Sequence, residues 1–84
     1  MDINFVDNYI NQKLAENDKF IKYTFYELRI KRNLSKEDTK EFLRLNQVYF
    51  EQKNYLVYYT GEEFLYNNEI IKVKPNELMI IVKK

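Results

Sequence analysis

Apolar residues recur every three or four positions through residues 35–53, a spacing that predicts a long amphipathic helix at the centre of the chain. Ser35 is a favoured N-cap residue, and Asp38 follows at close to the capping-box spacing. Asn54 can adopt the left-handed conformation that ends many helices. The apolar side covers roughly 220° of the helical wheel, so we expect contacts with a sheet and with a second element. The innermost residues are predicted to be Phe42, Leu45 and Tyr49.

Residues 3–16 have the same helical spacing, with apolar residues on one side and Asn, Asp and Gln on the other. The apolar side of this first predicted helix consists of Ile3, Val6, Ile10 and Leu14, widened by Phe5 and Tyr9.

Residues 20–32 are the ambiguous stretch. Apolar and charged residues alternate strictly from Tyr26 to Lys31, and the preceding residues are aromatic or β-branched. Period two and high β-propensity favour a strand over residues 23–31. If this stretch were helical instead, three helices followed by a hairpin would give the outline of a winged helix-turn-helix.

The C-terminal third predicts several strands separated by turn residues. Residues 55–60 are rich in aromatic and β-branched side chains, and Gly61 ends this strand or forms a bulge. Asn67 and Asn68 suit a tight turn between strands at 64–66 and 69–74. Pro75 suits the turn before a last strand at 78–83.

These elements predict a single α+β domain spanning residues 1–84, with the order α-β-α-β-β-β. We expect a two-layer sandwich in which two helices cover one face of a mixed or antiparallel sheet of three to five strands. The strand-helix-strand unit would form a right-handed crossover if its strands are parallel. Strand order stays open. The strand residues expected to pack against the central helix are Leu28, Ile30, Val57 and Ile80.

Composition argues against catalysis and against a cofactor. The chain has no His and no Cys, so the commonest general base, the commonest transition-metal ligands and the thiolate nucleophile are missing. One glycine cannot build a glycine-rich phosphate loop. No apolar run approaches the eighteen or so residues that span a bilayer. We therefore expect a soluble cytoplasmic protein that is not an enzyme and does not bind membranes.

Basic residues on the predicted strands suggest one mode of binding. If the strands at 23–31 and 69–74 were adjacent, their cations would form a ridge able to grip a nucleic-acid backbone. The residues concerned are Arg29, Lys31, Arg32, Lys72 and Lys74. The more ordinary interpretation is that lysines at strand edges prevent aggregation. A net charge of +1 also argues against strong steering toward nucleic acid.

Aromatic residues suggest the other mode of binding. Phe64 and Tyr66 lie in a short segment between turns, where burial is hardest to achieve, and exposed aromatic residues there would anchor a protein partner. Tyr58 is the third candidate for this surface. The alternative is that these side chains cap the core. We expect a non-catalytic protein-binding module, for example a phage or mobile-element protein that modulates a host enzyme, with nucleic-acid binding as the alternative and homodimerisation left open.

Overall fold

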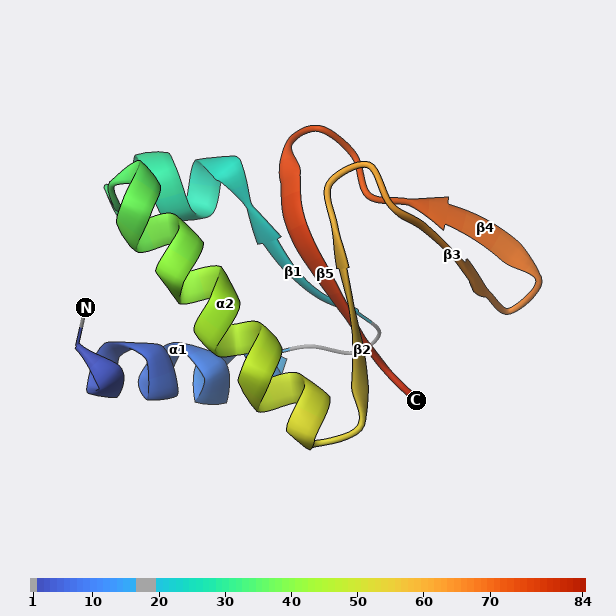
Figure 1. Cartoon of the computed structure of the whole chain (residues 1–84), viewed down its shortest axis with the longest axis horizontal. Helices are drawn as coiled ribbons and strands as arrows, with labels where there is room; N and C mark the ends of the chain where they lie inside the picture. Colours follow the sequence, from blue (N-terminus) through green and yellow to red (C-terminus); the bar gives the residue numbers. More distant parts are fainter. Residues whose placement is uncertain (1, 17–19) are drawn as a thin grey trace.

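The computed structural model describes residues 2–16 and 20–84, and these form the α+β fold expected from the sequence (Figure 1). The elements are α1 (Ile3–Glu16), β1 (Phe20–Thr24), the π-helical segment η1 (Tyr26–Lys31), α2 (Lys36–Gln52), β2 (Tyr55–Tyr59), β3 (Glu63–Tyr66), β4 (Glu69–Lys72) and β5 (Glu77–Lys83). None of the helices in these two ranges is long and apolar enough to cross a membrane.

The main sheet has three strands in the order β1-β5-β2, and β5 is antiparallel to both neighbours. Phe20 pairs with Val82 on one side of β5, and Tyr55 pairs with Lys83 on the other. β1 and β2 therefore run in the same direction, as the strand-helix-strand unit predicts. They are not neighbours, because β5 lies between them.

The main sheet is covered on both faces. Helices α1 and α2 lie on one side, and the β3–β4 hairpin extends from the other side (Figure 1). Alternation along the strands sends Tyr23 and Ile81 into the helical core, while Ile80 and Val82 contact the hairpin. The hairpin is a separate two-stranded sheet, so the strands form two sheets where the sequence suggested one.

The expected strand over residues 23–31 is wrong from Phe25 onward. The pairing of β1 with β5 becomes irregular between Tyr23 and Thr24, and Phe25 has α-helical backbone angles. The Thr24 side-chain oxygen then accepts a hydrogen bond from the Glu27 backbone N–H (3.1 Å), which helps to begin the helical turn. Residues 20–31 thus contain both a paired strand and a helical turn, so three helical segments precede β2, as in the winged helix-turn-helix outline given for the helical alternative.

The helical turn also corrects the predicted core. Leu28 is fully buried, but Ile30 is 58% exposed because helical geometry turns it away from Leu28. Ile80 is buried on the hairpin side of the sheet rather than against α2. Phe42 is fully buried in the helical core, as predicted, and three partly buried predicted residues pack against that core: Leu45, Tyr49 and Val57.

The capping and turn residues take their predicted roles. The Ser35 side chain accepts a hydrogen bond from the Asp38 backbone N–H (3.0 Å) and so caps α2. Asn54 follows α2 with a positive φ of 71°. Asn67 and Asn68 join β3 to β4 with φ values of 49° and 66°, as a type I′ turn requires.

Candidate functional site

The β3–β4 hairpin is held on the main sheet by aromatic residues, including those proposed for partner binding. Phe64 stacks on Tyr58 of β2 with ring centroids 4.3 Å apart, and meets Phe20 of β1 edge-on at 5.8 Å. Phe20 also contacts Tyr66, whose ring centroid is 4.8 Å away. These four side chains therefore fix the hairpin to both outer strands of the main sheet.

This packing corrects the expectation that Phe64 is exposed. Only 8% of Phe64 remains accessible, and Tyr58 and Tyr66 are partly buried in the same cluster. Phe64 thus belongs to the scaffold that supports the hairpin, which is the capping alternative considered for it above.

The outward face of the hairpin carries two aliphatic side chains instead. Leu65 and Ile70 form a cross-strand pair and are 70% and 73% exposed, the largest exposures among the large hydrophobic residues described. Alternation explains their position, because Phe64 and Ile71 point toward the sheet. Sequence reasoning missed this pair because it weighed aromatic residues alone. The signal was available: once the turn at 67–68 is placed, one face of the hairpin must carry Leu65 and Ile70 together.

A groove of about 480 Å³ lies between the hairpin and β1. Its lining combines apolar and charged side chains from β1, β4, β5 and the turn before β5: Phe20, Lys22, Ile70, Ile71, Lys72, Lys74, Glu77 and Ile80. The groove therefore contains both predicted hairpin lysines and one member of the exposed aliphatic pair.

Glu77 is the acidic residue of this groove, and its negative charge is compensated by a salt bridge to Lys22. Its carboxylate lies 3.2 Å from the Lys22 ammonium and accepts a hydrogen bond from the Lys74 backbone N–H (2.9 Å). Burial opposes the charged form, but the Lys74 N–H and the Lys22 charge outweigh it and hold the pKa of Glu77 below its usual value. Glu77 remains ionised at neutral pH.

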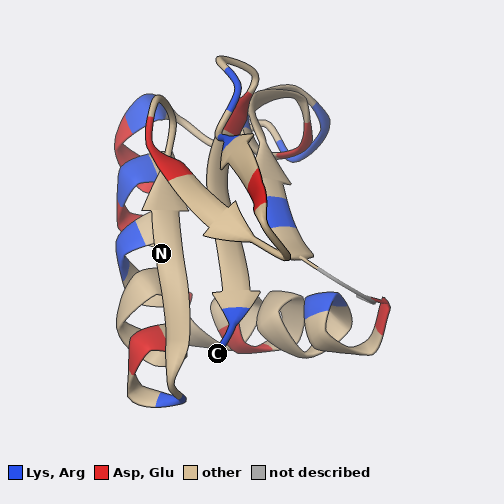
Figure 2. Ribbon diagram, turned by 90° about the vertical axis from the view of Figure 1, so that its right-hand side faces the viewer, with Lys and Arg blue, Asp and Glu red and all other residues tan. Residues whose placement is uncertain are grey.

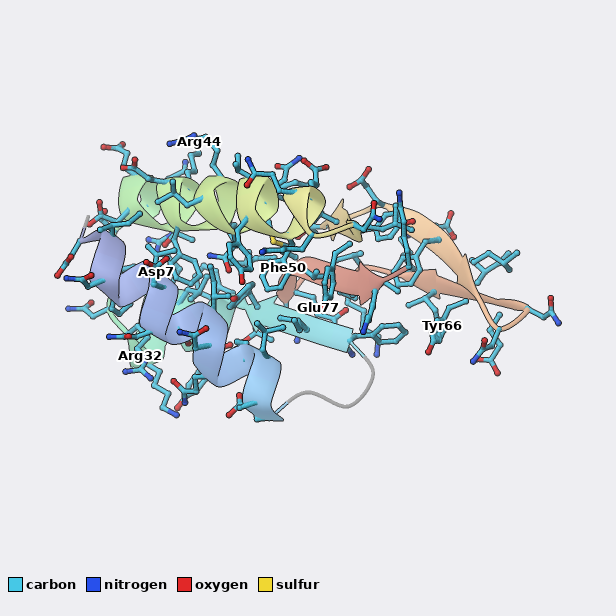
Figure 3. The ribbon with its side chains drawn as sticks, turned by 90° about the horizontal axis from the view of Figure 1, so that it is seen from below. Asp7, Arg32, Arg44, Phe50, Tyr66 and Glu77 are labelled. Atoms are coloured by element: carbon cyan, nitrogen blue, oxygen red, sulfur yellow. The ribbon has the colours of Figure 1, made fainter. Side chains whose placement is uncertain are left out.

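The five predicted cationic residues do not form one ridge. Lys72 and Lys74 lie at the hairpin, whereas Arg29, Lys31 and Arg32 belong to η1 and its C-cap. Figure 3 places Arg32 and Tyr66 toward opposite ends of the molecule, and Figure 2 shows basic and acidic residues interspersed over the ribbon. The prediction fails because it needed residues 26–31 to be a strand beside β4.

Two of the η1 cations have structural partners. The Arg29 Nε donates to the Leu34 carbonyl (3.1 Å), and the Arg32 guanidinium lies over the Tyr9 ring at 5.2 Å. These contacts attach η1 to the loop that follows it and to α1.

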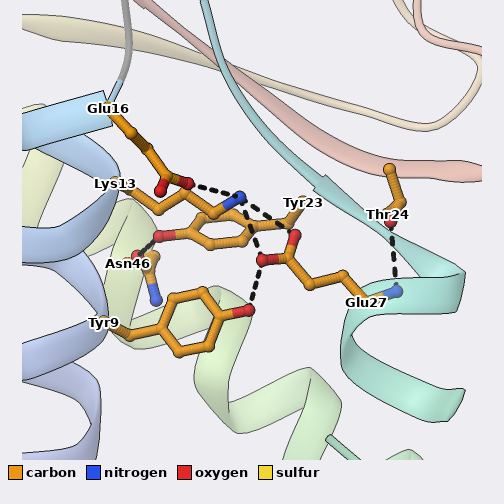
Figure 4. Close-up of polar contacts among 7 residues, drawn as sticks. All are labelled: Tyr9, Lys13, Glu16, Tyr23, Thr24, Glu27 and Asn46. Atoms are coloured by element: carbon orange, nitrogen blue, oxygen red, sulfur yellow. Dashed lines mark hydrogen bonds and ion pairs between the residues drawn. The ribbon is translucent and has the colours of Figure 1, made fainter. Parts of the chain in front are cut away.

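A polar cluster between α1, β1, η1 and α2 is the other candidate for chemistry (Figure 4). Lys13 makes a salt bridge with Glu27 (2.9 Å), and the Tyr9 hydroxyl donates to the same carboxylate. The Tyr23 hydroxyl donates to Asn46 Oδ1 (2.6 Å). Burial, followed by the nearby Glu27 carboxylate, raises the pKa of both tyrosines, so neither supplies a tyrosinate near neutral pH.

The polar cluster is satisfied internally. Among the residues that the structure describes, every buried side-chain nitrogen or oxygen has a hydrogen-bond partner. In the same residues, no group of three or more His, Cys, Asp or Glu side chains is placed to hold a metal ion. The cluster thus joins four elements, and its geometry fits a structural role.

A smaller hollow of about 210 Å³ lies between the two helices. Ile3 and Val48 line it and are each about half exposed. Asp7 and Arg44 place one charge of each sign at this hollow, so its electrostatics favour no one class of ligand.

No protein-family model, no curated protein and no solved structure matches this chain.

Proposed function

We propose that this chain is a non-catalytic protein-binding module and that its partner docks on the β3–β4 hairpin. The observation that carries the proposal is the cross-strand pair of Leu65 and Ile70, both more than two-thirds exposed on an element that extends from the body of the molecule (Figure 1). Contiguous exposed apolar side chains on a rigid support are typical of protein interfaces. Phe64 and Tyr58 contribute by fixing the hairpin, so that it loses little conformational entropy on binding.

The biological setting that we propose follows from composition. Lys, Asn, Ile, Tyr and Phe are abundant, as expected for an AT-rich genome, and the chain is short and lacks His and Cys. This combination is typical of small phage and mobile-element proteins. The proposed role is inhibition or modulation of a host enzyme or defence complex in the cytoplasm.

Affinity capture from the native host cell tests the binding surface. The double variant Leu65→Asn/Ile70→Asn should reduce recovery of the specific partner on the order of tenfold or more, because buried aliphatic anchors at an interface are lost. The matched control is Ile3→Asn/Val48→Asn, which makes the same change in the interhelical hollow and should retain the partner. Circular dichroism establishes that both variants are folded.

Two results would contradict the proposal. Equal partner recovery by the hairpin variant and the wild type would remove the hairpin as the docking surface. Tight, salt-sensitive retardation of DNA or RNA in a gel, lost on Lys72→Glu/Lys74→Glu, would favour nucleic-acid binding instead.

A further inference from the structure

Within residues 2–16 and 20–84, the backbone of β4 pairs with β3 along one edge and has an open edge on the other side. Val73 donates to the Glu62 carbonyl (2.9 Å) and accepts from the Gly61 N–H (3.0 Å), so its backbone polar groups face the β3 side. In an antiparallel ladder these groups alternate in direction from one residue to the next. The N–H and C=O groups of Ile70 and Lys72 must therefore point away from β3.

The open edge of β4 borders the groove described above. Ile70 and Lys72 both line that groove, and buried Ile80 contributes an apolar wall. The next alternate amide, that of Lys74, already donates to Glu77. The edge available for strand pairing is thus short and ends at Lys74.

The groove carries excess positive charge. Three of its lining residues are cationic, Lys22, Lys72 and Lys74, and one is anionic, Glu77, whose salt bridge is with Lys22. Neither the Lys72 nor the Lys74 ammonium group makes a salt bridge to any residue in the ranges 2–16 and 20–84. Glu63 opposes Lys72 across the hairpin but is not within salt-bridge distance of it.

We infer that the partner enters this groove as an extended segment, which pairs with the open edge of β4 at Ile70 and Lys72 and places acidic side chains against Lys72 and Lys74. This inference rests on the proposed function and specifies the chemistry of its partner. Strand addition supplies backbone hydrogen bonds, and the lysines select acidic residues on the face that Ile70 and Lys72 share. The alternate apolar side chains then lie on the opposite face, that of Ile71 and the Ile80 wall.

The test uses a synthetic peptide of alternating Glu and Val residues, titrated into the isotope-labelled full chain and followed by NMR. Saturable chemical-shift changes should be largest for residues at the β4 edge, and hydrogen exchange of the Ile70 and Lys72 amides should slow. Two matched peptides separate the contributions of charge and backbone: alternating Lys and Val, and the Glu–Val peptide N-methylated at every residue. Both should bind at least about tenfold more weakly.

Protein variants test the lysines. Lys72→Glu/Lys74→Glu should weaken binding of the Glu–Val peptide by about tenfold or more. Lys36→Glu/Lys40→Glu makes the same charge change on exposed positions of α2 and should leave binding within about twofold.

Three results would overturn the inference: no saturable shifts at β4, equal binding of the N-methylated peptide, or equal binding of the Lys–Val peptide. None of these touches the capture experiment with Leu65→Asn/Ile70→Asn, so the proposed function can survive them. Conversely, if Leu65→Asn/Ile70→Asn recovers as much partner as the wild type while the Glu–Val peptide still binds at β4, the proposed docking surface is wrong and the strand-pairing site remains.

Discussion

The Tyr23 hydroxyl of β1 donates a hydrogen bond to Oδ1 of Asn46 in α2 over 2.6 Å, and both residues are completely buried. The Asn46 amide nitrogen in turn donates to the Phe42 carbonyl (2.8 Å). Because a buried polar group without a partner is costly, this pair favours one rotation of α2 about its axis relative to the sheet.

Breaking this pair from one side should destabilise the protein. Tyr23→Phe leaves Asn46 Oδ1 without a donor and should lower the free energy of unfolding by about 1–3 kcal/mol, measured by urea denaturation. Tyr26→Phe, at a mostly exposed tyrosine, is the control and should change little. Adding Asn46→Leu to Tyr23→Phe should cost less than the sum of the single changes, and strict additivity would show that the two residues are not coupled.

Phe42 is expected to be the most sensitive aromatic position. Its ring meets those of Tyr9 and Tyr23 at centroid distances of 5.2 Å in both cases. Phe42→Ala should reduce the free energy of unfolding by about 3–5 kcal/mol, because the cavity is enclosed by packed rings. Val48→Ala, on the half-exposed side of α2, should cost far less. Comparable losses for the two variants would contradict the observed orientation of α2.

Alkaline pH should unfold the protein through its buried tyrosines. Burial raises the pKa of Tyr9, Tyr23 and Tyr59 in the folded state, and the unfolded chain titrates near pH 10. The contribution of these tyrosines to stability is therefore constant below about pH 10 and falls above it, by roughly 1.4 kcal/mol per pH unit for each tyrosine that stays neutral when folded. Tyr23→Phe should make this fall shallower. An equally steep fall in Tyr23→Phe and in the wild type would contradict the prediction.

Acid should release the Lys22–Glu77 contact. The folded-state pKa of Glu77 is lowered, so its contribution is present above the ordinary carboxyl pKa of about 4.3 and is lost as pH falls through the folded value. Wild type should exceed Glu77→Gln in stability by about 1 kcal/mol near neutral pH, since Lys22 is half exposed and its charge is screened. The two should converge in acid, as measured by thermal unfolding. A difference that does not change with pH would mean that the Glu77 charge is not responsible.

The sequence predicted correctly those elements in which the hydrophobic pattern and the capping or turn residues indicate the same structure. Ser35 and Asn54 mark the ends of α2, and Asn67 and Asn68 mark the hairpin turn. Residues 26–31 were predicted wrongly because a helical turn this short buries only one of its alternating apolar residues, Leu28. The Thr24 hydrogen bond to Glu27 that helps to begin the turn has no signal in the alternation.

The candidate site was only partly predictable. Lys72 and Lys74 do lie on one surface, but the residues that complete it, Lys22 and Glu77, come from β1 and β5. Their meeting depends on strand order, which alternation does not encode. The burial of Phe64 likewise depends on the hairpin folding over the sheet to meet Phe20.

The central position of β5 has a consequence for biosynthesis. β1 and β2 each pair only with β5 in the main sheet, and Phe20 must wait for Val82 to be translated before it finds its partner. Both helices and both outer strands thus leave the ribosome before the strand that unites them. Contacts between such distant residues slow folding, so the nascent chain exposes two unpaired apolar strands until β5 emerges. The protein should therefore acquire its sheet in one late step, with the hairpin closing locally beforehand.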